Sequence, residues 1–390
     1  MLFTNAQLQP ICSRSKVGVH KRRSLGPLLV GAAVAVLTLQ GVARGQNQLS
    51  PSPALYARTV QVAHAQNGGD NGQVIATVNS FANGSRVDVY ASGDGSGFTQ
   101  VGTITDGDFS SGLCCGTLFE LPQSVGGIPA GTLLWAGSVG QNAQDRRMQI
   151  KVYRSDDEGR NWYYLSGFSS PNTGGLWEPQ FTIADDGGLV IFYSDETDPA
   201  HSQRIVQARS YDGYNWQDFR NVVSSTVQND RPGMAVVNRL ANGSRFMTFE
   251  LCGPAACTVF WKTSGNGWDW GDPGNVGSAI RLPDGRFFEH APTNTVLPDG
   301  SILVIGQVLL NGDGSVAAGN GSTIFKHSGD PGQDWYAIGA PVSVPGAYDN
   351  YCPNYASPLL SLNGGSSVLE FADRGSNGDC YMFYNTGPSS

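Results

Sequence analysis

The sequence predicts an all-β protein, a six-bladed β-propeller built from Asp- or Asn-containing turn repeats. Three observations carry this prediction: a turn motif that recurs five times, hairpin patterns around its copies, and a composition suited to short strands. Of the 390 residues, 52 are Gly and 8 are Trp, 40% are hydrophobic, and only 14% are charged. Large all-β architectures often exceed the usual length of one domain, so the length requires no second domain.

The recurring motif reads Ser, a small or polar residue, Asp or Asn, Gly, and then an aromatic residue. Asp and Asn side chains fold onto backbone amides two residues later, and Gly supplies positive φ, so the motif is expected to build turns rather than perform catalysis. We expect the aromatic residue to pack between neighbouring sheets. The starts are 63, 55, 54 and 64 residues apart, a period typical of propellers and similar arrays. The copies begin at Ser92, Ser155, Ser210, Ser264 and Ser328.

Each repeat divides into strands joined by tight turns. In the fourth repeat, Gly233–Leu240 and Ser244–Leu251 form a hairpin, and Thr258–Thr263 leads into the motif. A sixth unit without the motif spans residues 357–384. The segment near Gln48–Ala54 could supply the last strand of this unit and close the ring.

The N-terminal residues 1–45 are predicted to be a targeting segment, followed by one propeller domain over residues 46–390. Lys16, Lys21, Arg22 and Arg23 precede an apolar run from Leu25 to Leu39, and small residues follow it. That run is shorter than the roughly 20 residues that span a bilayer. We therefore expect a secreted, extracellular monomer, with an uncleaved membrane anchor as the alternative.

Charge and cysteines narrow the classes of partner. The net charge of −8 argues against nucleic acid and anionic membranes. Apart from Cys12, an even number of cysteines remains, which suggests disulfides in an exported chain. No CxxC pattern is present and there are only five His, so we expect no metal and no other cofactor. The cysteines form three close couples, Cys114/Cys115, Cys252/Cys257 and Cys352/Cys380.

Adjacent Cys114 and Cys115 could bond only through a strained vicinal ring, so their pairing stays open at this point. Three Asn-Gly-Ser sequons could carry glycans if the host glycosylates. They begin at Asn83, Asn242 and Asn320.

Two glutamates map to one face of the predicted propeller, in adjacent blades. In antiparallel blades, the starts of first strands and the ends of second strands surround the axis on the same face, where loops can carry a site. Glu178 starts a first strand, and Glu250 ends a second strand inside an apolar run. Glu is depleted in strands, so Glu250 stands out there. The alternatives for these glutamates are a buried structural Glu paired with an Arg, or an ordinary loop Glu. Two carboxylates that face a sugar ring are what glycoside hydrolysis needs.

Other residues on this face are candidates for substrate binding. Arg58 and Arg231 start first strands, Trp177 could stack on a sugar, and Tyr351 and Tyr355 lie in the loop before the sixth unit. A packing or rim role is the alternative for each. For His290, which maps to the same face, we expect a structural role.

The turn motif resembles the Asp-box of sialidase-like propellers. The stretches Leu176-Trp-Glu-Pro179, Arg231-Pro-Gly-Met234 and Thr248-Phe-Glu-Leu-Cys-Gly253 resemble the exo-arabinanases of glycoside hydrolase family 93. The resemblance runs from about Leu55 to the C-terminus. It implies a six-bladed propeller that releases arabinobiose from the non-reducing ends of linear α-1,5-arabinan, a plant cell-wall polysaccharide, with retention. Matched by motif, Glu178 is the acid/base and Glu250 the nucleophile.

Two other functions compete with this interpretation. A sialidase needs three converging arginines and a Tyr–Glu couple, for which Arg58, Arg231 and Arg374 with Tyr351 or Tyr355 are candidates. Its usual Arg-Ile-Pro signature is absent. A non-catalytic sugar-binding propeller would keep the blades and the aromatic residues without requiring both glutamates.

Overall fold

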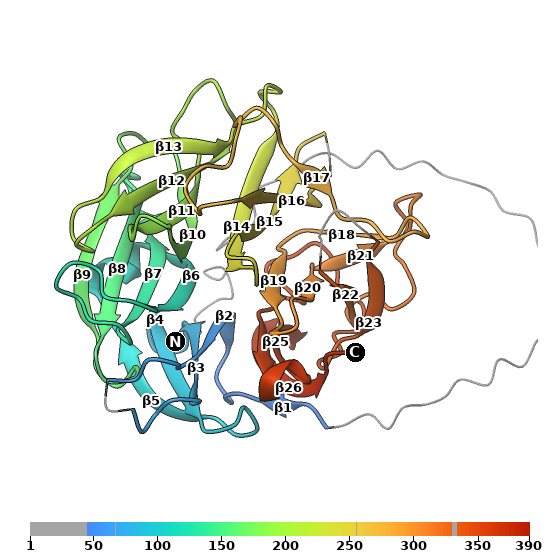
Figure 1. Ribbon diagram of the computed structural model, residues 1–390, viewed down its shortest axis with the longest axis horizontal. Coiled ribbons are helices and arrows are strands. Elements are labelled where there is room, and N and C mark those ends of the chain that lie inside the picture. Colours follow the sequence, from blue (N-terminus) through green and yellow to red (C-terminus); the bar gives the residue numbers. More distant parts are fainter. Residues whose placement is uncertain (1–44, 67, 255, 330–333) are drawn as a thin grey trace, which may run out of the picture.

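The computed structural model describes residues 45–66, 68–254, 256–329 and 334–390 (Figure 1). The predicted targeting segment and Cys12 therefore lie outside the described residues, except for Gly45. Within the described ranges, no helix has the length and apolar character needed to cross a membrane.

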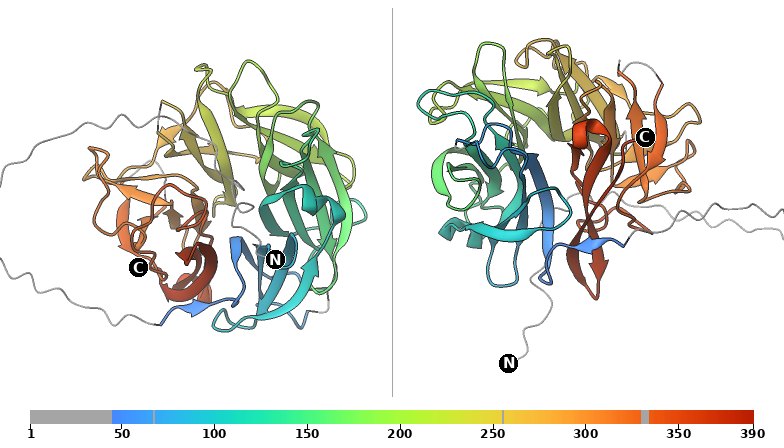
Figure 2. Two further views of the ribbon diagram at one scale, coloured as in Figure 1. Left: turned by 180° about the vertical axis from the view of Figure 1, so that it is seen from behind. Right: turned by 60° about the horizontal axis from the view of Figure 1, so that its bottom comes forward.

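Six antiparallel sheets stand side by side around a central axis, as Figure 1 shows face-on and Figure 2 shows from behind and in a tilted view. The predicted six-bladed propeller is thereby confirmed. Blade 1 contains β2 (Ala54–Gln61), β3 (Val74–Ser80), β4 (Arg86–Ser92) and β5 (Thr99–Ile104). Blade 2 contains β6 (Leu113–Glu120), β7 (Leu133–Val139), β8 (Gln149–Ser155) and β9 (Tyr163–Ser169). Blade 3 contains β10 (Leu176–Ile183), β11 (Leu189–Asp195), β12 (Arg204–Ser210) and β13 (Gln217–Val223).

The second half of the ring follows the same order. Blade 4 contains β14 (Arg231–Arg239), β15 (Arg245–Cys252), β16 (Thr258–Ser264) and β17 (Ser278–Ala279). Blade 5 contains β19 (Thr293–Val296), β20 (Ile302–Ile305), β22 (Thr323–His327) and β23 (Tyr336–Gly339). Blade 6 contains β24 (Leu359–Leu362), β25 (Ser367–Ser376), β26 (Asp379–Pro388) and β1 (Asn47–Gln48).

Four short elements lie outside or beside this regular plan. The strands β18 (Phe287–Glu289) and β21 (Val308–Leu310) pair with each other and extend the sheet of blade 4 through β16. No pattern in the sequence predicts this extension. Two 3₁₀ helices, η1 (Gly107–Ser111) and η2 (Asn363–Gly365), occupy connections.

The ring is closed by strand β1 from the N-terminal side, which pairs with β26 from the C-terminal side. This confirms that the segment before blade 1 supplies the last strand of blade 6. The predicted segment was too long, however: only Asn47 and Gln48 pair with blade 6, while Ala54 already belongs to β2. Joining the two ends of the chain in one sheet couples blade 1 to blade 6.

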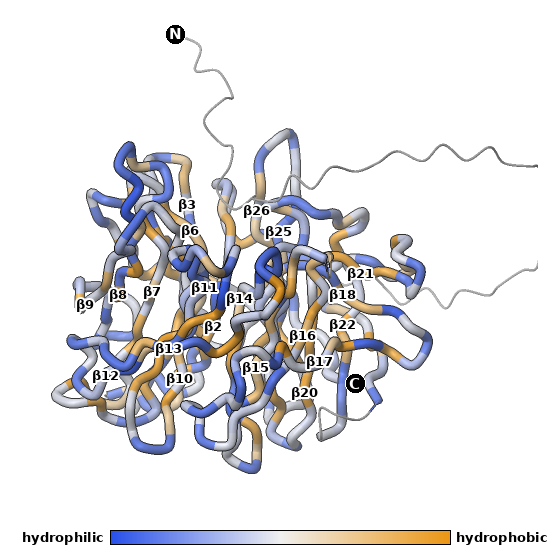
Figure 3. The backbone as a smooth tube through the Cα atoms, turned by 90° about the horizontal axis from the view of Figure 1, so that it is seen from above, coloured by the Kyte–Doolittle hydropathy of each residue, from blue (hydrophilic) through white to orange (hydrophobic). Residues whose placement is uncertain are grey.

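The core lies between the blades. Every residue of the second strands β3, β7 and β11 is buried, because neighbouring blades cover both faces of each of these strands. Many of the apolar residues lie along the strands, with polar residues in the connecting loops at both ends (Figure 3).

The predicted turn motifs form the expected hydrogen bonds. In the first four copies the Gly N–H donates to the Ser Oγ of the same motif at 2.9 Å, and the fifth copy lies partly outside the described residues. The aromatic residue packs against the preceding blade: Trp270 contacts Phe192 edge-on at 5.7 Å between ring centroids. Phe98 of blade 1 contacts Tyr384 of blade 6 at 4.9 Å. The motif is thus structural, as predicted.

All three predicted cysteine couples are disulfides, including the adjacent pair Cys114–Cys115. The Cys252–Cys257 bond spans the connection between β15 and β16, and Cys352–Cys380 ties the loop before blade 6 to β26.

Candidate active site

The first strand of each blade bends as it reaches the axis. In blades 1 to 4 the pairing register of this strand with the second strand is interrupted by a β-bulge. The bulge places a non-Gly residue at positive φ, which is uncommon for such side chains and re-aims them. The residues at these positions are Tyr56, Cys115, Glu178 and Met234, with φ between 56° and 61°. Ala291 and Ala356 have positive φ at the corresponding places in blades 5 and 6.

Five of these six residues join one buried cluster at the axis, against which Trp177 and Tyr355 pack. Glu178 is the polar member of the ring. The same distortion that closes the centre of the propeller with apolar groups therefore turns a carboxyl group toward that centre.

Glu178 is held by hydrogen bonds from three blades. Its own N–H donates to Ser138 Oγ of blade 2 at 3.1 Å. Its Oε2 accepts from Ser194 Oγ of blade 3 at 2.6 Å and from the Met234 N–H of blade 4 at 3.0 Å. As a whole residue, Glu178 is half-buried. The three hydrogen bonds therefore fix the direction of the carboxyl group.

Glu250 at the end of β15 is held from blade 5. Its Oε2 accepts from the Ala291 N–H at 2.9 Å, and His290 Nδ1 lies 3.7 Å from the same oxygen. The Glu250 side chain is 13% exposed. On its other side, His290 Nε2 lies 3.5 Å from a carboxylate oxygen of Asp349.

The two glutamates converge through Gly233. This residue is the partner of Glu250 in the β14–β15 ladder, where opposed Cα atoms are typically ~4.5–5.5 Å apart. A Cβ atom on Gly233 would lie 3.4 Å from Glu178 Oε2. Gly233 thus borders both acids. Glu178 and Glu250 therefore lie close together on the same face of the propeller.

The electrostatics of the two acids differ. Burial raises the pKa of Glu178 from 4.5 to about 7, and the negative charge of Glu250 adds to this rise. The hydrogen bonds from Ser194 and Met234 oppose the rise by stabilising the carboxylate. Burial lowers the pKa of His290, but the hydrogen bond and charge of Glu250, with the charges of Asp349 and Glu289, together leave that pKa above its usual value. Glu178 is suited to carry a proton at neutral pH, with a cation-forming His beside Glu250.

Two tyrosines and one arginine border the carboxyl pair. The Arg58 guanidinium lies 4.1 Å from the centre of the Tyr56 ring and donates to the Ala356 carbonyl at 2.9 Å. The Tyr56 and Tyr355 rings are 6.3 Å apart. Burial, followed by the charges of both glutamates, raises the pKa of Tyr355 well above its ordinary value. Tyr355 is therefore a neutral phenol next to the acids.

Tyr351 lies in the same region. Together with Tyr56 and Tyr355 it lines a small pocket against the Cys114–Cys115 disulfide. Three of the residues predicted to bind substrate, Arg58, Tyr351 and Tyr355, thus lie at the centre of the propeller.

Arg231 lies beside this centre rather than in it, whereas Trp177 packs against the buried cluster at the axis. Arg231 pairs with Glu196 at 2.5 Å and donates to Gln203 Oε1 at 2.6 Å. The Trp177 ring lies 5.4 Å from the Arg146 guanidinium. Arg231 and Arg146 line a neighbouring cavity, which Trp177 adjoins through Arg146.

Several residues of this site were not predicted from the sequence. Ser194 and the backbone amides of Met234 and Ala291 orient the acids, and Gln203 lies beside Gly233, which borders both acids. Hydroxyl and amide donors of this kind are too common in strands to stand out without the fold.

The three arginines considered for a sialidase are held in separate environments. Arg58 caps carbonyls near the axis, Arg231 pairs with Glu196, and Arg374 donates to Gln46 Oε1 at 2.8 Å while lying over the Phe383 ring. Each of these guanidinium groups interacts with other groups of the protein. The three arginines therefore do not converge as a sialidase needs for a carboxylate substrate.

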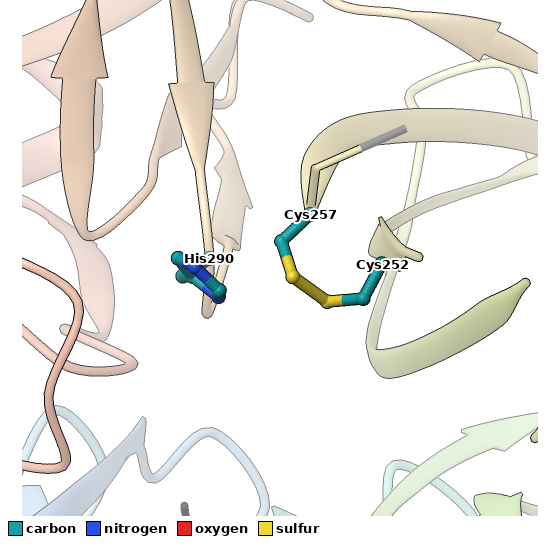
Figure 4. A group of neighbouring side chains, drawn as sticks. All are labelled: Cys252, Cys257 and His290. Carbon is teal, nitrogen blue, oxygen red and sulfur yellow. A yellow bond between two sulfur atoms is a disulfide. The ribbon is translucent and has the colours of Figure 1, made fainter. Parts of the chain in front are cut away.

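One group of residue types that can ligate a metal stands near Glu250. The ligand atoms of Cys252, Cys257 and His290 lie within 4.8 Å of one another. Figure 4 shows the two sulfurs bonded to each other beside the imidazole. A disulfide offers no thiolate, so this group does not fit a thiolate-bound metal.

Comparisons with known proteins identify relatives by fold. The chain is similar to a Penicillium chrysogenum α-L-arabinanase bound to arabinobiose, with 22% identity, a TM-score of 0.72, and coverage of 90% of this chain and 99% of that one. It is also similar to the family 93 α-L-arabinofuranosidase of Fusarium graminearum with arabinobiose, with 20% identity, a TM-score of 0.71, and coverage of 89% and 98%.

A more distant similarity is to the NanB sialidase of Streptococcus pneumoniae, with 12% identity, a TM-score of 0.56, and coverage of 88% of this chain and 69% of that one. No protein-family model and no curated protein matches the sequence. At these identities the structural likeness establishes the shared fold.

Proposed function

We propose that this chain is a glycoside hydrolase that cleaves arabinan with Glu178 and Glu250. One observation carries the proposal: two glutamates from adjacent blades border Gly233 at the centre of the propeller, where one of them has a pKa of about 7. The fold shared with an arabinanase and an arabinofuranosidase bound to arabinobiose supports arabinan as the substrate. Release of arabinobiose from chain ends, with retention, is the finer part of the proposal and rests on the motif resemblance.

The mechanism follows from the different environments of the acids. Glu178 is the general acid, because burial and the nearby negative charge favour its protonated form. It donates its proton to the glycosidic oxygen while Glu250 attacks the anomeric carbon, which breaks the glycosidic bond and forms an ester to the sugar.

Formation of the ester removes the negative charge of Glu250. Because that charge raises the pKa of Glu178, the pKa falls and Glu178 becomes a base. It then accepts a proton from water as the water oxygen attacks the anomeric carbon, and Glu250 leaves as a carboxylate.

The site also supports a binding role for its central aromatic residues. Tyr355 and Tyr351 are phenols on one side of the carboxyl pair, and Arg58 is fixed over Tyr56. Aromatic faces and fixed donors suit a sugar ring. We further propose that the protein is an exported monomer, in line with its leader-like N-terminus and its disulfides.

The proposal is tested by incubating the protein with linear arabinan and separating the products by chromatography. We expect arabinobiose as the main product. Glu178→Gln should reduce turnover of arabinan by ~10²–10⁴-fold, the range typical of general acid–base catalysis. Glu250→Gln should abolish turnover, and Glu120→Gln, on the opposite face, should leave it unchanged.

Two outcomes would contradict the proposal. Wild-type protein that binds arabinan without cutting it would indicate a sugar-binding propeller. Cleavage of sialyllactose in place of arabinan would indicate a sialidase.

A further inference from the structure

The imidazole of His290 lies between two carboxyl groups. Its Nδ1 lies 3.7 Å from Glu250 Oε2, and its Nε2 lies 3.5 Å from a carboxylate oxygen of Asp349. A neutral imidazole has one N–H donor and one bare acceptor nitrogen, so one of the two acids would face a lone pair. Only the imidazolium, in which both nitrogens carry a proton, attracts both acids. The geometry therefore favours the charged form of His290.

The charged groups that face this imidazole favour the same form. They are acids from three elements: Glu250 at the end of β15, Glu289 in β18, and Asp349 in the loop before blade 6. Arg281 partly offsets the charge of Glu289. The neighbouring Cys252–Cys257 disulfide carries no charge, and Tyr355 is a neutral phenol. The acids outweigh burial, so the pKa of His290 lies above its usual value.

The backbone around His290 fixes the imidazole in this position. Its N–H donates to the Cys257 carbonyl at 3.0 Å, and its carbonyl accepts from the Gln307 N–H at 2.9 Å. His290 and Ala291 have positive φ of 62° and 46°, a conformation that persists in such residues when the surrounding structure holds it. The same turn directs the Ala291 N–H to Glu250 Oε2. Two successive residues thus act on one oxygen of Glu250.

The two glutamates differ in the charge of their partners. Among the described residues, His290 is the only cation-forming side chain within 4.0 Å of a Glu250 carboxyl oxygen. Glu178 accepts hydrogen bonds from Ser194 Oγ and the Met234 N–H, which are neutral donors. The proposed mechanism needs one acid protonated and the other ionised at the same pH. One positive charge beside Glu250, on the side of blade 5, supplies that difference.

We propose that His290 is a positioning residue: as an imidazolium held between Asp349 and Glu250, it keeps the nucleophile ionised beside a protonated Glu178. The inference rests on the proposed function and deepens it. His290 acts only through Glu250. Asp349 acts one step further out, because its side chain is 69% exposed and its negative charge favours the proton on the imidazole. A purely structural role, as expected for His290 from the sequence, would leave the ionisation of Glu250 unchanged.

The first test is independent of activity. The pKa of His290 is measured by NMR titration of protein labelled with ¹⁵N in its imidazole rings, and its signals are assigned as those lost in His290→Asn. We expect this pKa to fall by about one unit in Glu250→Gln and by less in Asp349→Asn, since each change removes a negative charge beside the imidazole. A His290 pKa that neither substitution lowers would overturn the inference.

The second test is the kcat/KM–pH profile for 4-nitrophenyl arabinobioside. Its leaving group departs with little help from an acid, so the acidic limb of the profile reports the ionisation of Glu250. His290→Asn removes the charge and tolerates the positive φ of this position, and His290→Lys restores a positive charge. His64→Asn is the matched control, because His64 is exposed and its N–H donates to Glu120 on the opposite face.

An opposite charge within ~4–6 Å favours the ionised form of a carboxyl group by ~1–3 pH units. Without that charge, more of the enzyme has a protonated nucleophile at acidic pH. We therefore expect the acidic limb to move up by at least about one pH unit in His290→Asn, with kcat/KM on that limb falling ~10-fold or more. His290→Lys should move the limb back toward its wild-type position, and His64→Asn should leave the profile unchanged.

A lower rate at every pH in His290→Asn, with the acidic limb in its wild-type position, would show a purely structural role. That result would overturn the inference while leaving the proposed function standing. Wild-type protein that cleaves neither arabinan nor the aryl arabinobioside would instead overturn the proposed function, and this inference with it.

Discussion

Replacing Glu250 by glutamine should lower the pKa of Glu178, because the glutamine keeps the size of the side chain and removes its charge. The pKa of Glu178 is raised from 4.5 to about 7, first by burial and then by the charge of Glu250. Only the second contribution disappears in Glu250→Gln. Burial and the hydrogen bonds from Ser194 and Met234 remain.

The size of the effect can be bounded. One pKa unit corresponds to about 1.4 kcal/mol, so the raised pKa represents roughly 3 kcal/mol in favour of the protonated acid. Two unit charges ~5.5 Å apart, the separation typical of retaining glycosidases, repel by ~3 kcal/mol at an effective dielectric constant of ~20. Because burial contributes more than Glu250, we expect the pKa of Glu178 to fall by about one to two units.

The assay is a ¹³C NMR titration of protein labelled at the glutamate carboxyl carbons. The Glu178 resonance is assigned as the signal that is lost in Glu178→Gln. Glu120→Gln serves as the control, because Glu120 ends β6 on the opposite face and should not affect the titration of Glu178. An unchanged Glu178 pKa in Glu250→Gln would refute the reasoning, since the two carboxyl groups would then be too far apart to share a substrate.

Three further predictions concern single positions. Ser194→Ala removes a hydrogen bond that stabilises the Glu178 carboxylate, so the pKa on the basic side of the kcat/KM–pH profile should rise. Gly233→Ala places a Cβ 2.3 Å from Gln203 Nε2 and 3.4 Å from Glu178 Oε2, so arabinan turnover should fall at least ~10-fold with an unchanged circular dichroism spectrum. Burial raises the pKa of Glu370 to about 8, so the free energy of unfolding should fall by up to about 5 kcal/mol between pH 4.5 and 8, as the unfolded state alone loses this proton. Denaturant unfolding of Glu370→Gln should lack this fall and match wild type near pH 4.

The propeller architecture was predictable because short, local residue patterns determine its turns and strands. The turn motif at Ser210 and its equivalents can be recognised from a short run of residues. The spacing between its copies gives the length of one blade, and that length indicates how many blades the chain can form. Closure by Asn47 and Gln48 was predictable only in outline, because a two-residue strand has no pattern of its own. The β18–β21 extension of blade 4 was missed, since each strand has only three residues.

The pair of acids was predictable for a different reason. A carboxylate in an apolar strand, as at Glu250, conflicts with its surroundings. Glu178 starts a first strand, and the starts of first strands share a face with the ends of second strands, so the two positions point to one site. Their support was not predictable. The bulge that turns Glu178 toward the axis has a non-Gly residue at positive φ, so no glycine marks it, and the Met234 N–H reaches Glu178 from another blade.

In the proposed mechanism, Glu250 forms a covalent bond to the anomeric carbon, while Glu178 first donates a proton and then accepts one. The most direct measurement uses an activated 2-deoxy-2-fluoro arabinofuranosyl inactivator, followed by proteolysis and mass spectrometry of the labelled peptide. One sugar attached to Glu250, with slower labelling in Glu178→Gln than in wild type, is the predicted result. A sugar attached to Tyr355, or no labelled peptide from protein that is turning over arabinan, would contradict it.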